Sequence, residues 1–250
     1  MPDAPWFERA FGPEYLLLYA HRSPEEGAAQ VQDLLRSGLL ERRSPVLDLG
    51  CGAGRHLRAM RAAGLRALGL DLSRDLLAHG ALGGVAVRGD MRRLPWRRGA
   101  FACVTSLFTS FGYFNDAENL AVLREVRRVL QPGGALLLDH INPGPTLAKL
   151  VPQSRETLGE AVVTSTRRHD AAGRRVIKEV EMAHGQSVQR WQESVRLYEP
   201  DELDRLLQSA GLEVERRCAD FAGGPFDPSA SPSFDIQVRL DAAFRDTPQA

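Results

Sequence analysis

The sequence predicts an α/β fold in which helices flank a mostly parallel sheet of seven strands. From residue 46 to residue 141, short apolar runs alternate with amphipathic helical patterns, and such runs are typical of parallel strands buried on both faces. Three longer strand patterns with polar turns follow between residues 162 and 197. They predict an antiparallel β meander that is inserted into the α/β fold.

The composition is that of one compact domain. The chain has 250 residues, of which 43% are hydrophobic, and this is enough for one sizeable core. Its 32 basic and 32 acidic side chains balance, so no net field attracts nucleic acid or an anionic membrane. An 18-residue apolar run and a charged leader are absent, and the three cysteines show no metal-binding spacing. We therefore expect a cytoplasmic protein without a metal site.

Residues 1–45 are predicted to form a helical cap ahead of the first strand. Residues 6–20 are rich in aromatic side chains and are expected to be helical. Ser23-Pro24 has the form of an N-cap followed by a first-turn proline, so a further helix is expected to run to about Leu40. The aromatic segment either packs onto the sheet or folds over the carboxyl edge of the sheet as a lid.

A glycine-rich turn connects the first predicted strand to the helix after it. Gly50, Gly52 and Gly54 occupy every second position, and glycine allows positive φ and leaves no Cβ in the way of a ligand. The amides that open the next helix are unpaired donors, so the backbone can approach a cofactor here. A dinucleotide fingerprint would need glycine at position 55, where the chain has Arg55. Alternatively, these glycines only form the tight turn of an ordinary parallel α/β unit and bind no cofactor.

The second predicted strand ends at Asp71, about 20 residues beyond the glycines, where an acidic side chain can accept hydrogen bonds from a ribose diol. Taken alone, N-capping of the helix that begins near Ser73 explains Asp71 equally well. The third predicted strand covers residues 85–88 and ends in Gly89-Asp90-Met91. Two successive strands thus end in acidic side chains at the same edge of the sheet.

Aromatic side chains follow the fourth predicted strand, over residues 101–107. Gly112 lies between Phe111 and Tyr113 and interrupts strand alternation, which favours the wall of a pocket over a continued strand. A helix over residues 117–130 comes next.

The parallel part closes with a Pro132-Gly133-Gly134 turn and a buried strand over residues 135–140. After the meander, a helix to about Ala210 and strands over residues 212–219 and 234–240 are expected. The polar tail beyond Phe244 is expected to fray.

Asp48 followed by Gly50, Gly52 and Gly54 resembles the first motif of class I S-adenosylmethionine-dependent methyltransferases. The order of helix, Pro-Gly-Gly turn and apolar strand resembles the end of the same core, so the resemblance covers about residues 46–141. It implies a Rossmann-like sheet with an antiparallel terminal strand, S-adenosyl-L-methionine as the cofactor and a small-molecule acceptor. The chain lacks the Asn-Pro-Pro-aromatic signature of enzymes that methylate nucleobase amines, which argues against a nucleic-acid substrate.

The resemblance also implies the cofactor site. Its members are Arg22, Asp48, Gly50, Cys51, Gly52, Gly54, Asp71, Leu72, Asp90, Met91 and Leu107. In this assignment Asp71 binds the ribose, and Asp90 with Met91 contacts the adenine. Asp48 either steadies the glycine turn or receives the ammonium group through water. Arg22 either meets the carboxylate of the cofactor or remains a solvated surface side chain.

The reaction requires mainly the alignment of an acceptor lone pair, a methyl carbon and a leaving sulfur. We therefore expect neither a metal ion nor a protein nucleophile, and the methionine part of the cofactor is expected near Leu107. If a proton has to be removed, His140 is the best candidate base, because it lies at the ligand-binding edge. Alternatively, the His140 imidazole only hydrogen-bonds to the backbone at the end of its strand and has a structural role. Tyr113 and Tyr15 are further candidates, which would position the acceptor by hydrogen bonding.

The sequence thus predicts methyl transfer to a small molecule, with nitrogen acceptors slightly ahead of oxygen acceptors. Two alternatives stay open, an NAD-dependent oxidoreductase and a protein that binds S-adenosylmethionine without transferring the methyl group. We expect a core over residues 46–250, with a β insertion over residues 150–198 that covers the acceptor site. The protein is expected to be a monomer or a homodimer.

Overall fold

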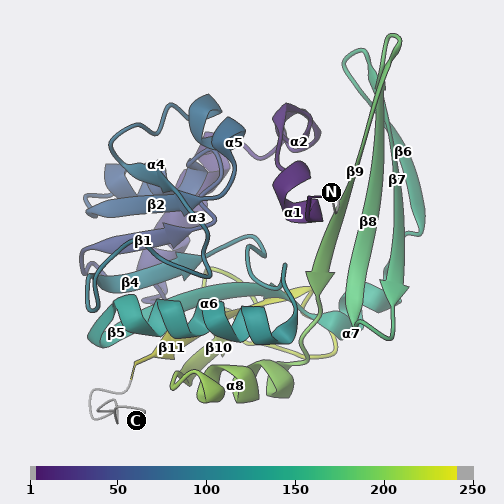
Figure 1. The fold of residues 1–250 in the computed structure, drawn as a ribbon. Helices are drawn as coiled ribbons and strands as arrows, with labels where there is room; N and C mark the ends of the chain where they lie inside the picture. Colours follow the sequence, from purple (N-terminus) through teal and green to yellow (C-terminus); the bar gives the residue numbers. More distant parts are fainter. Residues whose placement is uncertain (1–3, 241–250) are drawn as a thin grey trace.

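A seven-stranded sheet forms the body of the protein (Figure 1). The computed structural model describes residues 4–240. The strand order across this sheet is β10-β11-β5-β4-β1-β2-β3. The strands are β1 (Val46–Leu49), β2 (Ala67–Asp71), β3 (Ala86–Arg88), β4 (Phe101–Ser106), β5 (Leu130–Ile141), β10 (Glu213–Cys218) and β11 (Ser233–Arg239).

Most neighbouring strands in this sheet are parallel. β1 is parallel to β2 and β4, β2 to β3, and β4 to β5, whereas β11 is antiparallel to both β5 and β10. The predicted Rossmann-like sheet with an antiparallel terminal strand is therefore confirmed. The carboxyl ends of β1 to β5 share one edge, which is where open α/β sheets bind ligands.

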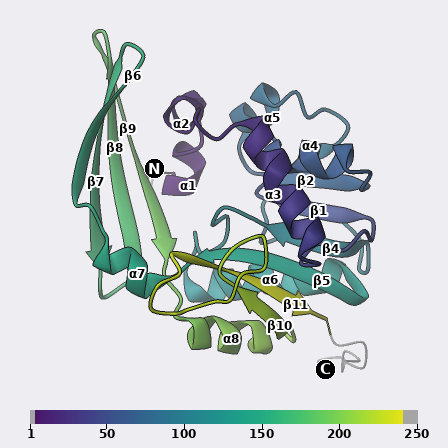
Figure 2. The ribbon, with the colours of Figure 1, turned by 180° about the vertical axis from the view of Figure 1, so that it is seen from behind.

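Helices cover both faces of the sheet (Figures 1 and 2). The apolar sides of α6 (Asp116–Val129) and α8 (Pro200–Ser209) join one core cluster with side chains of the sheet. Those of α3 (Pro24–Arg36) and α4 (Arg55–Ala62) join a second cluster, while the short α5 (Arg74–His79) follows β2. The sheet is thus buried on both faces, as its apolar strands require.

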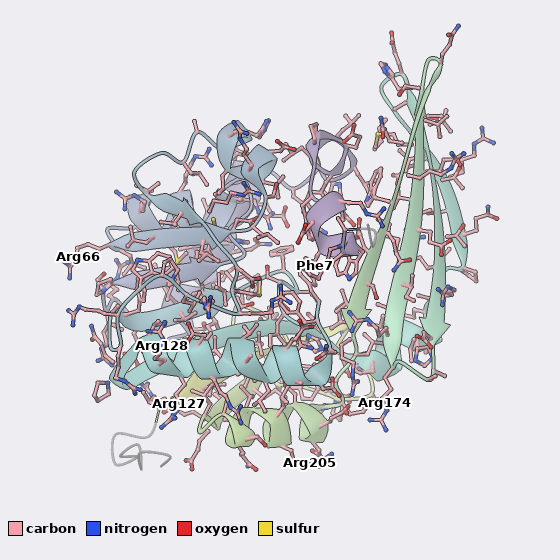
Figure 3. All side chains as sticks on the ribbon, in the orientation of Figure 1. Phe7, Arg66, Arg127, Arg128, Arg174 and Arg205 are labelled. Atoms are coloured by element: carbon pink, nitrogen blue, oxygen red, sulfur yellow. The ribbon has the colours of Figure 1, made fainter. Side chains whose placement is uncertain are left out.

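The amino-terminal segment is helical, as predicted, and forms two short helices. α1 (Trp6–Arg9) and α2 (Pro13–Leu18) lie between the carboxyl edge of the sheet and strand β9 (Ser187–Arg196) (Figures 1 and 2). The break falls at Gly12, the extended N-cap of α2, before a proline that suits a first helical turn. Phe7 points from α1 towards the loop after β4, where its ring centre is 4.9 Å from that of Phe114 (Figure 3).

The meander is a separate antiparallel sheet of four strands, not three. Its order is β6 (Gln153–Leu158), β7 (Ala161–Asp170), β8 (Arg175–His184) and β9. β6 was not predicted, because it is a largely exposed edge strand whose sequence, Gln-Ser-Arg-Glu-Thr-Leu, has no alternating apolar pattern. The short α7 (Pro143–Ala148), also unpredicted, leads from β5 into this sheet.

Two predicted element ends differ from the structure. α3 was expected to reach about Leu40 but ends at Arg36, because Gly38 just beyond it adopts a left-handed φ of 76°. The Pro132-Gly133-Gly134 segment lies inside β5 as an irregularity, where the register with β4 shifts. The tail beyond Phe244 lies outside the described residues. Between residues 4 and 240, no helix combines the length and apolar character needed to cross a bilayer.

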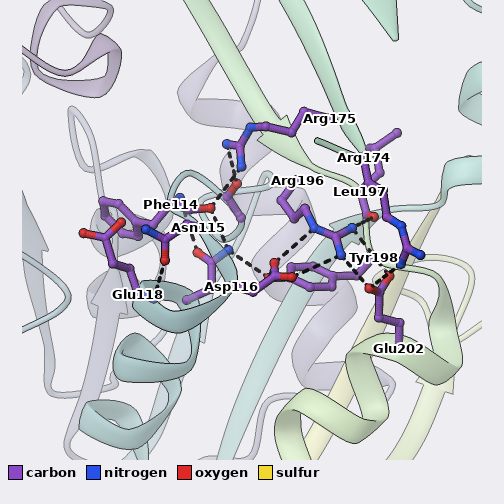
Figure 4. A network of polar contacts seen from close by, with 12 residues as sticks. Phe114, Asn115, Asp116, Glu118, Arg174, Arg175, Arg196, Leu197, Tyr198 and Glu202 are labelled. Carbon is purple, nitrogen blue, oxygen red and sulfur yellow. Dashed lines mark hydrogen bonds and ion pairs between the residues drawn. The ribbon is translucent and has the colours of Figure 1, made fainter. Parts of the chain in front are cut away.

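A buried ionic network joins the meander to the core (Figure 4). Arg196, at the end of β9, donates to Asp116 at 3.0 Å and also to Glu202 of α8, and its side chain is only 6% exposed. The ring of Tyr198 packs 4.4 Å from the Arg196 guanidinium carbon, and its hydroxyl donates to Asp116 at 2.7 Å. Arg175 of β8 donates to the backbone carbonyl oxygen of Phe114 at 3.0 Å. The four-stranded sheet is therefore tied to α6, α8 and the loop after β4.

Candidate active site

A cavity of about 190 Å³ lies at the carboxyl edge of the parallel strands, beneath α1 and α2. Its lining comes mainly from five segments. The amino-terminal segment contributes Phe7, Phe11, Tyr15, Leu16, Tyr19 and Arg22. The turn after β1 contributes Gly50, Cys51, Gly52 and Ala53, the ends of β2 and β3 contribute Asp71, Leu72, Gly89, Asp90 and Met91, and the loop after β4 contributes Leu107, Phe108, Ser110, Tyr113 and Phe114.

The glycine turn lies against the loop after β4. Gly50 has a φ of 72°, and a Cβ there would come within 2.8 Å of the Cβ of Ser110. Gly54 lies outside the lining. It begins α4 with a φ of 82°, and a Cβ there would meet Leu82 at 2.6 Å. Both glycines therefore permit close packing within the protein, Gly50 against Ser110 and Gly54 against Leu82, and of the two only Gly50 lines the cavity.

Asp71 binds the glycine turn directly. One carboxylate oxygen accepts from the Gly52 N–H at 2.7 Å, and the other accepts from the Ser73 N–H at 2.8 Å. Ser73, not Asp71, caps α5, because its hydroxyl accepts from the Leu76 N–H at 3.1 Å. Burial raises the pKa of Asp71, while the backbone donors favour its ionised form. Asp71 also lines the cavity, where a carboxylate can accept further hydrogen bonds through lone pairs that the backbone amides do not use.

Asp90 and Met91 lie together at the end of β3. The Arg92 guanidinium hydrogen-bonds both oxygens of Asp90, at distances between 2.7 and 3.1 Å, and with the Arg92 backbone N–H it outweighs burial and lowers the pKa of Asp90. The same guanidinium lies 4.4 Å from the ring centre of Phe114. Arg92 was not predicted as part of the site, because an arginine in an arginine-rich stretch carries no local signal.

Two further predicted residues differ in their access to the cavity. Arg22 lines it, with its guanidinium carbon 4.0 Å from the ring centre of Tyr19 and one nitrogen 3.4 Å from the Tyr15 hydroxyl. Asp48 lies outside the lining, is 3% exposed and accepts a hydrogen bond from Thr105 at 3.0 Å. Burial raises the pKa of Asp48 to about 7. Arg22 is thus placed to meet a ligand, and Asp48 to support the strand beneath the turn.

The predicted tyrosines take part in a chain of aromatic contacts over the cavity. Tyr113 stacks on Phe11 with ring centres 5.5 Å apart, and Tyr15 lies between Phe11 at 5.0 Å and Tyr19 at 4.5 Å. Burial raises the pKa of both Tyr15 and Tyr113, so their hydroxyl groups stay protonated at neutral pH. The structure therefore brings Tyr15 and Tyr113 together with the glycine turn, Asp71 and Asp90.

His140, like Gly54 and Asp48, lies outside the lining of the cavity. It is fully buried, and its Nε2 accepts from the Tyr198 N–H at 3.3 Å. Its ring lies among those of Phe111, Tyr198 and Phe234. Burial lowers the pKa of His140 to about 3. The expectation of a base at the ligand-binding edge is corrected here, because β5 directs the imidazole into an aromatic cluster and away from the cavity.

Comparison with known proteins agrees with this geometry. Residues 46–134 match the family model described as a methyltransferase domain. The chain is 31% identical to the cypemycin N-terminal methyltransferase of Streptomyces sp. over 193 residues, which are 72% of this chain and 77% of the relative. The chain belongs to the S-adenosylmethionine-dependent methyltransferases. S-adenosylmethionine is the cofactor of this family, and the NAD-dependent alternative is therefore set aside.

Two further relatives of this methyltransferase extend the likeness to almost the whole chain. Over 84% of its length it is 29% identical to the dTDP-3-amino-3,4,6-trideoxy-alpha-D-glucopyranose N,N-dimethyltransferase of Streptomyces venezuelae, of which the match covers 92%. The CcbJ methyltransferase from Streptomyces caelestis superimposes with a TM-score of 0.74 at 25% identity, covering 88% of this chain and 91% of that one. The likeness therefore extends well beyond residues 46–134.

Proposed function

We propose that this enzyme methylates an amine nitrogen of a small molecule that binds beneath the amino-terminal helices. The observation that carries the proposal is the wall that these helices form with the loop after β4. That wall consists of Phe7, Phe11, Tyr15, Tyr19, Tyr113 and Phe114. Aromatic faces attract a cationic amine, and phenol oxygens accept hydrogen bonds from N–H groups.

The relatives support nitrogen as the acceptor atom. One relative is named as a methyltransferase of the cypemycin N-terminus, and another as an N,N-dimethyltransferase of an amino sugar nucleotide. An amine also suits a site without an evident base. Its lone pair attacks the methyl carbon while the carbon–sulfur bond breaks, and the product ammonium then loses its proton to solvent. No side chain therefore needs to hold a proton during the transfer itself.

The residues at the cofactor end have distinct proposed roles. When bound, S-adenosylmethionine supplies an activated methyl group on a sulfonium. Asp71 binds the ribose, and Asp90 with Met91 contacts the adenine. Arg22 meets the carboxylate of the methionine part, close to Leu107. Asp48 steadies the strand beneath the glycine turn through its hydrogen bond with Thr105.

The amino-terminal cap, residues 1–45, and the β insertion, residues 150–198, together cover the acceptor end in this proposal. Tyr19 connects the two parts. Its hydroxyl donates to Glu193 of β9 at 2.8 Å and accepts from Lys178 of β8 at 2.9 Å. A cover that excludes water holds donor and acceptor in line, and this alignment is the main source of acceleration in methyl transfer.

Acceptor chemistry and Tyr113 can be tested together. We expect amines to be methylated at least about tenfold faster than matched alcohols and phenols, as measured by release of S-adenosylhomocysteine.

Tyr113→Phe should lower kcat/KM for the amine about tenfold, because one oriented hydrogen bond is worth about 1 kcal/mol or slightly more. Binding of S-adenosylhomocysteine to this variant should stay within about twofold of wild type, by calorimetry. Faster methylation of the alcohols would contradict the nitrogen assignment.

His140→Gln tests the corrected role of the histidine. We expect the rate of methyl transfer to remain within about twofold, because an imidazole with a pKa near 3 stays neutral from pH 6 to 8 and does not reach the cavity. The variant should melt at a lower temperature, since it disturbs a packed aromatic cluster. A tenfold loss of turnover with unchanged cofactor binding would restore His140 as the base.

A further inference from the structure

The turn after β4 is strained at two consecutive residues. Phe108 and Thr109 have φ values of 54° and 56°, although neither is glycine. Each residue with a side chain in this left-handed region costs about 1 kcal/mol or more, so such strain persists only where the surroundings impose it. Some other group must therefore hold this turn.

That group is the carboxyl group of Asp139, on the neighbouring strand β5. It is 8% exposed, and one of its oxygens accepts from the Thr109 N–H at 3.2 Å. The backbone N–H of Phe108 also stabilises the ionised form of Asp139, as does the positive charge of Arg22. The buried carboxylate thus accepts a hydrogen bond from one strained residue, Thr109, and its charged form is favoured by the amide of the other, Phe108.

A second carboxyl group settles which of the two carries the charge. Asp235 of β11 is the register partner of Asp139, is 2% exposed, and has one oxygen without a hydrogen-bond partner in the part of the chain that the structure describes. Burial and the neighbouring Asp139 raise the pKa of Asp235, whereas the backbone amides beside Asp139 oppose the rise that burial causes in the pKa of Asp139. The negative charge of the pair is therefore better stabilised on Asp139, the carboxyl group that faces the amides.

The held turn forms one end of the cavity. Phe108 lines the cavity, stacks on His56 with ring centres 5.2 Å apart, and has the Arg55 guanidinium carbon 4.2 Å from its ring centre. Leu107 and Ser110, on either side of the turn, also line the cavity. Asp139 and Thr109 themselves lie outside the lining, so Asp139 can affect a ligand only through the turn.

We propose that Asp139 is a positioning residue for the methyl donor, because its carboxylate holds Phe108 and Thr109 in the left-handed conformation that forms the donor's methionine end. The proposal rests on the proposed placement of that end beside Leu107. In this proposal, the hydrogen bond from the Thr109 N–H to Asp139 offsets the cost of the left-handed backbone conformation. A glycine at position 109 would remove that cost, and the hydrogen bond would then no longer be needed.

The test is a rescue experiment with S-adenosylhomocysteine as the probe and calorimetry as the measurement. Asp139→Ala should weaken binding about tenfold, the equivalent of one charge-assisted hydrogen bond. Thr109→Gly alone should bind within about threefold of wild type. The double variant Asp139→Ala/Thr109→Gly should recover to within about threefold, because glycine enters the left-handed region freely. Asp235→Asn is the matched control and should bind within about twofold, since the Thr109 amide donates to Asp139 and not to Asp235.

A second measurement needs no ligand. In the free protein, amide hydrogen exchange at Thr109 should be slow in wild type and in Asp235→Asn, and at least about tenfold faster in Asp139→Asn, which keeps the volume of the side chain but not its charge. Unchanged exchange in Asp139→Asn, or a double variant that binds as weakly as Asp139→Ala, would overturn the proposal. Failure of wild type to bind S-adenosylhomocysteine would instead count against the placement of the donor site and leave the exchange result standing.

Discussion

Asp71→Ala should reduce the affinity for S-adenosylhomocysteine at least about a hundredfold. The change removes the carboxylate that orders the Gly52 and Ser73 amides and, in the proposed site, accepts two ribose hydrogen bonds. Hydrogen bonds to a charged group contribute about 1.5–3 kcal/mol each, and every 1.4 kcal/mol is a factor of ten in the dissociation constant. Isothermal titration calorimetry measures this loss directly.

Asp75→Ala is the matched control for this experiment. Asp75 carries the same charge a few residues away, in the first turn of α5, but its side chain is exposed and lies outside the cavity. Its removal should change the affinity by no more than about twofold, since exposed charges are screened by solvent. Equal losses in the two variants would show that general electrostatics, not ribose binding, explains the effect.

Arg196→Met should lower the free energy of unfolding by about 3 kcal/mol. Removal of one partner of a buried ion pair leaves an uncompensated charge, and typical losses are about 3–5 kcal/mol. The lower end applies here, because Asp116 is 57% exposed and water can solvate it, while Glu202 is only 21% exposed. Urea unfolding followed by circular dichroism measures the change.

Arg174→Met provides the comparison for Arg196. Arg174 pairs with the same Glu202 at 2.8 Å, but its side chain is 64% exposed. The expected loss is below about 1 kcal/mol, as for other surface pairs, and should shrink further in salt. If the two variants lost the same stability, burial of the Arg196 network would not be what stabilises the contact between the two sheets.

The parallel sheet could be predicted from sequence because its signals are local. Each buried strand of the core is a short apolar run, and each is followed by a turn or cap that ends it, as Gly50 does after β1 and Ser73 does after β2. β6 lacks such a signal, since an exposed edge strand needs no apolar face. The helical character of the amino-terminal segment was predicted, but its division into α1 and α2 at Gly12 was not.

The candidate site was predictable where function depends on backbone shape or on strand ends. Gly50, Asp71 and Asp90 lie at or just beyond the carboxyl ends of β1, β2 and β3. Once these strands are predicted to be parallel, all three residues must lie at the same edge of the sheet. The direction of a side chain at a strand end is a matter of register, and this is why His140 was misplaced. Arg92 and Asp139 act through contacts across the fold, with Phe114 and Thr109 respectively, and no local pattern encodes those contacts.

The position of β11 in the chain has a consequence for synthesis. β5 contains Leu136, Leu137 and Leu138, and it pairs with β4 on one side and with β11 on the other. β11 begins only at Ser233, so the nascent chain exposes one flank of β5 while the whole four-stranded sheet and α8 are still being made. An apolar strand with an unpaired edge is a template for aggregation. Pairing with β11 therefore protects β5 of the newly made protein from self-association. Proteolytic cleavage just before Ser233 would expose the same flank of β5, so we expect a loss of solubility before a loss of activity.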